Sequence, residues 1–282
     1  MSEYQYYEFL AMERPLTREE QQQMRDISSR GHITPVSFSN EYQWGNFKGD
    51  PIGLMKRFYD AHVHVADWCT ALFMLRVPLA VLDRNRLNTA IVSGVFEAEA
   101  TATHWILTWN LDESEEYDRG CEVDGSGWMA RLSPLRDELL CGDLRPLYIG
   151  WLAAVSQGSV DDDESEPCLP EGLAPFSPAQ QALAEFLEVD EDLLNGAGLD
   201  RPLATHQVAE EDIDSWLASL EVAELRGWVK QLLTGQVQEV VRGVQNRFAA
   251  GGKGTDDGRN DGHTRTAGDL WELAERAGEI RQ

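Results

Sequence analysis

Asp60, His62 and His64 stand at alternate positions of one short segment, and these residue types are common metal ligands. On an extended strand, residues two apart point to the same face, so the two imidazoles could bind one ion. Asp67 could add a further carboxylate oxygen, which would suit a hard or borderline metal. The candidate metal ligands are therefore Asp60, His62, His64 and Asp67.

The same segment resembles the Asp-x-His-x-His opening of metal-dependent amidohydrolases, where the histidine pair ends a barrel strand and binds the metal. The resemblance implies a metal-dependent hydrolase that uses Asp60, His62 and His64. The neighbouring residues favour a helix instead, because the apolar side chains of residues 54–65 recur at helical spacing. On a helix, side chains at positions i and i+2 diverge and would not bind one ion. The alternative interpretation is a pair of polar side chains near the end of a helix.

Other catalytic signatures are missing from the sequence. Gly125-Ser126-Gly127 predicts a tight turn and lacks the form of a nucleophile elbow. Gly252-Lys253-Gly254-Thr255 has no preceding strand and no following helix, which a phosphate-binding loop requires. The four cysteines form no Cys-x-x-Cys pair, so reduced thiols are expected. We therefore expect no cofactor and assign no catalytic residue.

The formal net charge of −25 is concentrated in one part of the chain. Residues 1–86 carry 10 basic and 11 acidic side chains, whereas residues 87–282 carry 14 basic and 38 acidic ones. An acidic surface repels nucleic-acid phosphate and anionic lipid at long range. We therefore expect no direct binding to nucleic acid or membranes, and we expect a protein partner, for which a basic surface would be favourable.

The sequence contains no long apolar run and no secretory signal. No stretch approaches the roughly 18–20 apolar residues of a membrane span. The first residues lack a basic region followed by an apolar one. With 42% hydrophobic and 26% charged residues, the composition is typical of a globular protein, which we expect to be soluble and cytoplasmic.

The periodicity of apolar residues predicts an α+β fold. In a mixed α/β region, residues 1–111, strands are expected at 4–12, 32–44, 69–77 and within 95–111, with helices at 17–28, from 50 to about 65 and at 79–87. Residues 112–249 are acidic and predict mainly helices, at 128–140, 144–155, 177–187, 213–220 and 237–248, with an exposed linker near 156–176.

The C-terminal segment combines a predicted tether with a predicted helix. Residues 250–268 have the composition of a flexible tether, and residues 269–282 predict a short amphipathic helix. Its candidate partner-binding residues are Leu270, Trp271, Leu273, Ala277 and Ile280. Such a helix either docks in the groove of a partner or folds back onto its own chain.

Three strings, SEYQYYEF at residues 2–9, TPVSFSNEYQWGNFKG at 34–49 and GDLRPLYIGWLAAV at 142–155, resemble a group of uncharacterised bacterial proteins. The resemblance covers roughly residues 1–250 and implies a bacterial, cytoplasmic protein. No activity is established for that group, so it implies no catalytic or binding residue.

Three functions are compatible with the sequence. The first is a non-enzymatic interaction or adaptor protein, which the missing catalytic signatures, the uneven charge and the terminal helix favour. The second is the metal-dependent hydrolase. The third is an acidic mimic of nucleic acid that occupies a basic partner, although the longest acidic run, residues 161–166, lies in the predicted linker.

Overall fold

The computed structural model of the chain describes residues 4–43, 45, 47–68, 70–111, 125–167, 175–198, 210–234, 240, 244, 247 and 265–281. Within these ranges, every helix is too short or too polar to cross a membrane.

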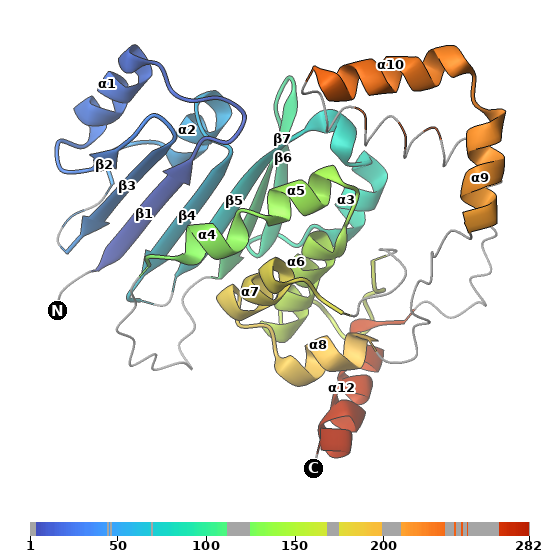
Figure 1. Ribbon diagram of the computed structural model, residues 1–282. Coiled ribbons are helices and arrows are strands. Elements are labelled where there is room, and N and C mark those ends of the chain that lie inside the picture. The colour runs from blue at the N-terminus through green and yellow to red at the C-terminus, as the bar shows by residue number, and fades with distance from the viewer. Residues whose placement is uncertain are drawn as a thin grey trace.

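A seven-stranded antiparallel sheet forms the centre of the molecule, with the strand order β2-β3-β1-β4-β5-β7-β6 (Figure 1). The strands are β1 (Gln5–Leu10), β2 (His32–Ile33), β3 (Ser37–Tyr42), β4 (Ala61–Ala66), β5 (Ala71–Pro78), β6 (Phe96–Ala100) and β7 (His104–Leu111). The α+β prediction is therefore confirmed, with the whole sheet built by the first 111 residues.

Alternation along the strands divides the buried side chains between two cores. Val63, Phe73 and Trp109 belong to the larger core on one face of the sheet. Phe9 and Met74 belong to the smaller core on the other face. Because a one-residue shift in register would exchange the two faces, these two sets of apolar residues fix how the strands pair.

The smaller core is covered by α1 (Arg18–Ile27) and α2 (Pro51–Arg57), which contribute Met24, Leu54 and Met55. Thr17 and Glu20 form the predicted capping box at the start of α1.

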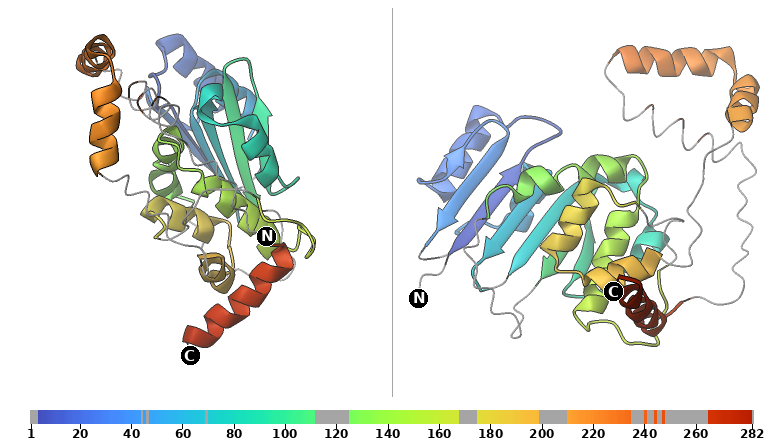
Figure 2. Two further views of the ribbon diagram at one scale, coloured as in Figure 1. Left: turned by 90° about the vertical axis from the view of Figure 1, so that its right-hand side faces the viewer. Right: turned by 60° about the horizontal axis from the view of Figure 1, so that its bottom comes forward.

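The larger core is covered by helices of the second half of the chain (Figure 2). They are α4 (Trp128–Leu132), α5 (Leu135–Leu140), α6 (Arg145–Ser156), α7 (Pro178–Phe186), α8 (Glu191–Gly198) and α12 (Ala267–Arg281). From the first half of the chain, η1 (Leu79–Val81) and α3 (Arg84–Ala90) also pack against this core. Residues 146–155 of α6 are all buried, as expected for a helix that is apolar all round. Gly150 allows α6 to approach the sheet, because a Cβ there would lie 2.8 Å from the indole nitrogen of Trp109.

Two helices lie apart from this body. These are α9 (Glu210–Ser219) and α10 (Val222–Leu233), and the views in Figures 1 and 2 agree that they stand away from the sheet. Stacked indole rings of Trp216 and Trp228, with centroids 6.2 Å apart, hold the two helices together.

Several predicted elements need correction. The predicted helix from residue 50 to about 65 ends at Arg57, and β4 begins at Ala61, because residues 61–66 pair with both β1 and β5. The predicted helix 128–140 is two helices separated at Ser133 and Pro134.

The predicted linker near 156–176 is not uniformly exposed, because Val160 and Glu166 are buried. The last residues of the predicted tether, from Arg265, pair with this segment through a bridge between Ser165 and Thr266. Residues 112–124, most of the predicted helix 237–248 and residues 250–264 of the tether lie outside the described residues.

Candidate functional site

His62 and His64 lie on β4 and face the smaller core, not the end of a helix as their neighbours predicted. The ring of His62 stacks on Phe9, with centroids 3.9 Å apart, and its Nδ1–H donates to the carbonyl oxygen of Glu8 at 2.9 Å. The ring of His64 stacks on Tyr7 at 4.1 Å. Burial lowers the pKa of His62 to about 3 and that of His64 to about 4, so both imidazoles are neutral at physiological pH.

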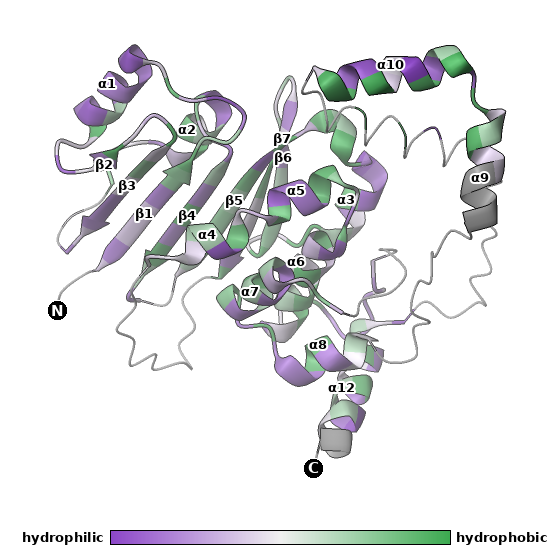
Figure 3. Ribbon diagram, viewed as in Figure 1, coloured by the Kyte–Doolittle hydropathy of each residue, from purple (hydrophilic) through white to green (hydrophobic). Residues whose placement is uncertain are grey.

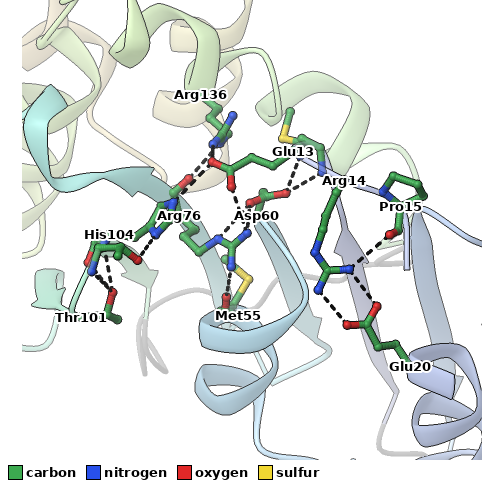
Figure 4. A network of polar contacts seen from close by, with 12 residues as sticks. Glu13, Arg14, Pro15, Glu20, Met55, Asp60, Arg76, Thr101, His104 and Arg136 are labelled. Atoms are coloured by element: carbon green, nitrogen blue, oxygen red, sulfur yellow. Dashed lines mark hydrogen bonds and ion pairs between the residues drawn. The ribbon is translucent and has the colours of Figure 1, made fainter. Parts of the chain in front are cut away.

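Asp60 uses its carboxylate for internal contacts (Figure 4). Oδ2 accepts the backbone N–H groups of Met12 at 2.6 Å and Glu13 at 2.8 Å. Oδ1 accepts both Nε and Nη2 of Arg76, at 2.9 and 2.6 Å. The side chain is 1% exposed, so its charge is compensated by Arg76 and by two amides.

Asp67 lies just beyond the other end of β4, where it accepts the backbone N–H of Tyr4 at 2.9 Å. Asp60 and Asp67 are thus separated by the whole strand, about 20 Å. In the part of the chain that the structure describes, no three His, Cys, Asp or Glu side chains are grouped to hold a metal. The four predicted ligands therefore do not converge.

The Asp60–Arg76 pair belongs to a larger polar network, which no pattern in the sequence predicts (Figure 4). Glu13 accepts Nη2 of Arg136 at 2.5 Å and lies 3.4 Å from Nε2 of His104. Nε of Arg136 donates to the carbonyl oxygen of Arg76 at 2.8 Å. The network joins the loop after β1, the end of β5 and α5. The network has a structural role and holds these segments together, because each carboxylate is paired with a guanidinium.

A second buried network fixes the start of α12. Glu166 accepts Nε and Nη2 of Arg265, at 2.9 and 2.8 Å, and the hydroxyl of Tyr148. Arg265 also donates to the carbonyl oxygen of Ala197 in α8 at 3.1 Å. The segment before α12 is therefore tied to α6 and α8.

The predicted partner-binding face of the terminal helix is packed against the chain's own α8. Leu270, Leu273 and Ala277 are buried there. Trp271 is half-buried against the larger core, and the side chain of Ile280 lies outside the described residues. Of the two arrangements compatible with the sequence, the structure therefore shows the helix folded back.

Among the described residues, four of the seven exposed large hydrophobic side chains lie on α10. Figure 3 shows hydrophobic and hydrophilic residues alternating along this helix. Val222, Val229, Leu232 and Leu233 are 62%, 55%, 43% and 84% exposed. Their spacing of seven, three and one residues places them on one face, with Leu225 between them. We call these five residues the α10 stripe.

The side of α10 next to the stripe is already occupied. Trp228 stacks on Trp216 of α9, and Glu224 pairs with Arg247 at 3.1 Å. Arg226 and Lys230 are exposed along one border of the α10 stripe. This side therefore joins α10 to α9, and the four exposed residues of the stripe face solvent.

Comparison with protein-family models, curated proteins and solved structures gave no match for this chain. The site must therefore be judged on its own geometry.

Proposed function

We propose that this chain is a non-enzymatic protein-interaction protein and that α10 is its docking helix. The observation that carries the proposal is the α10 stripe, an exposed apolar face on a helix that packs against α9 through the neighbouring Trp228. Burying an aliphatic side chain completely is worth about 1.5–3 kcal/mol, so a partner that covered the stripe would gain affinity from each residue. Contiguous apolar patches on a polar surface are typical of interaction sites.

The spacing of the stripe indicates the form of the partner. Apolar residues at intervals of three and four along a helix match the stripe of a second amphipathic helix. Arg226 and Lys230 would favour acidic residues along the facing border of that helix. The basic partner suggested by the net charge would contact other surfaces of the acidic chain.

A second copy of the chain fits this surface less well. An antiparallel two-fold pairing of α10 with itself would place the Arg226 border of one copy against the same border of the other. Like charges would then meet across the contact. The proposal therefore commits to a different protein. Neither the hydrolase nor the nucleic-acid mimic gains support from the described residues, so neither is proposed.

Site-specific photocross-linking in cells of the source organism tests the proposal. A photoreactive amino acid replaces Leu233 in one variant and Val36, which is 44% exposed on the sheet region, in the control. We expect a discrete heterologous product from position 233 that is absent from position 36. Identical products from both positions, no product from 233, or a dimer of the chain itself would contradict the proposal.

A further inference from the structure

A cavity of about 580 Å³ opens between the end of α1 and the outer edge of β3. It is lined by Ser28 and Arg30 beyond the helix, by Asn40 and Tyr42 of the strand, and by Lys48. The register explains why a cavity forms here, because β2 pairs with β3 only at Phe38 and Ser39 and leaves the edge of residues 40–42 uncovered. Its volume is within the range of small-molecule sites, 300–1,000 Å³. It lies at the end of the sheet remote from α10 (Figure 1).

Several of the residues that line this cavity can donate hydrogen bonds. The hydroxyl oxygen of Ser28 accepts both the N–H of Gly31 and the amide of Asn40, each at 3.1 Å. A hydroxyl that accepts two bonds still has its own hydrogen to donate. Ser28 is 7% exposed, and no acceptor for that hydrogen occurs among the described residues. The cavity wall thus contains a buried hydroxyl that can still donate a hydrogen bond.

Two cations stand at the rim. Neither Arg30 nor Lys48 forms an ion pair within the described part of the chain. Glu41 also borders the cavity, but alternation along β3 places its side chain on the other face of the sheet from Asn40 and Tyr42. Two unpaired cations in a chain of net charge −25 favour a bound anion.

We propose that this cavity binds a small phosphorylated compound through its phosphate group. A phosphomonoester carries about −1.5 to −2 charges at pH 7 and three acceptor oxygens. Those oxygens match the Ser28 hydroxyl, the Arg30 guanidinium and the Lys48 ammonium, whereas a carboxylate would neutralise only one of the two cations. The side-chain carbonyl of Asn40 and the hydroxyl of Tyr42 would form hydrogen bonds with the remainder of the compound.

Titration of the full-length chain with inorganic phosphate, followed by two-dimensional amide NMR, tests the proposal. We expect saturable shifts at residues 28–31 and 40–48, and a dissociation constant raised at least fivefold by either Arg30→Ala or Lys48→Ala. Arg18→Ala, which removes an exposed cation from α1 outside the cavity, is the matched control and should leave the constant unchanged. Acetate at equal ionic strength should bind at least fivefold more weakly.

Three results would overturn the proposal: shifts that do not saturate, equal binding of acetate and phosphate, or the same loss in Arg18→Ala as in the cavity variants. Because all three replaced side chains are exposed, unchanged melting temperatures will show that the variants remain folded.

Discussion

His62 and His64 stack on Phe9 and Tyr7 in the smaller core, and this environment determines their chemistry. Their spacing on the chain could be read from the sequence. Their burial could not, because it arises from pairing with β1, more than fifty residues away. The same holds for Asp60, whose partner Arg76 lies in a different strand. Residue types and intervals were thus predictable, whereas the contacts that remove them from metal chemistry were not.

The lowered pKa values of the two histidines make stability depend on pH. The unfolded chain binds protons near pH 6.5 while the folded chain does not, so stability is complete above that pH and falls as the pH drops toward the folded pKa values. Lowering the pH from 7 to 5 should therefore reduce the free energy of unfolding by roughly 2 kcal/mol for each histidine.

Replacement of His64 by Phe should remove its share of this loss. The Nε2 atom of His64 is buried without a hydrogen-bond partner in the described structure, so Phe should also raise stability at pH 7 by about 1 kcal/mol. Urea unfolding at pH 7 and pH 5 measures both effects. His32→Phe, at an exposed position, is the control; an equal change of pH dependence in both variants would refute the burial argument.

The Asp60–Arg76 pair should be strongly coupled. Arg76→Met leaves a buried carboxylate without its cation and should cost about 3–5 kcal/mol of unfolding free energy. The double variant with Asp60→Asn should lose less than the sum of the single variants. Lys56→Met breaks the exposed pair with Glu99 and should cost less than about 1 kcal/mol. Equal costs at the two pairs would show that Asp60 is not buried as described.

At the scale of elements, strands with strong β-formers were predictable, and helix boundaries less so. The predicted strand 4–12 contains β1, and the predicted strand 69–77 covers all of β5 except Pro78. Helix α2 and β4 were merged in the prediction, because the side chains of residues 54–65 recur at helical spacing. Only the pairing with β1 and β5 makes residues 61–66 extended. Helices α8 and α10 were not predicted; the first is only eight residues long.

The contact of α8 with α12 depends on Gly196. A Cβ there would lie 2.7 Å from the backbone nitrogen of Ala274, whereas a Cβ at Gly198 would meet nothing within 4 Å. Gly196→Ala should therefore lower the free energy of unfolding by about 1–3 kcal/mol and speed amide hydrogen exchange in residues 270–278 more than tenfold. Gly198→Ala should leave exchange unchanged. Unaltered exchange in Gly196→Ala would mean that α12 does not pack on α8 in solution.

At the scale of the whole molecule, the composition predicted the net charge but not how the C-terminal helix packs on the rest of the chain. The sheet ends on β2, which has two residues, and on β6, where Glu97 and Glu99 are exposed, and both features discourage edge-to-edge association. Closure of the C-terminal helix onto α8 depends on Arg265 meeting Glu166, a contact between distant segments that local patterns cannot predict.

The net charge predicts a salt effect on the whole molecule. Repulsion among acidic side chains should destabilise the compact state at low ionic strength. Raising NaCl from 10 to 150 mM should therefore increase the melting temperature by about 2 °C, which corresponds to about 1 kcal/mol for a chain of this size. A lower melting temperature in salt would show that ion pairs outweigh the repulsion.

The affinity of the cross-linked partner for α10 variants tests the central claim most directly. Val229→Asp places a charge in the middle of the α10 stripe, while Val36→Asp places one at a similarly exposed site elsewhere. By isothermal calorimetry, we predict that Val229→Asp raises the dissociation constant at least tenfold and that Val36→Asp changes it less than twofold. Equal constants for the wild type and Val229→Asp, with both proteins folded, would contradict the assignment of α10 as the docking helix.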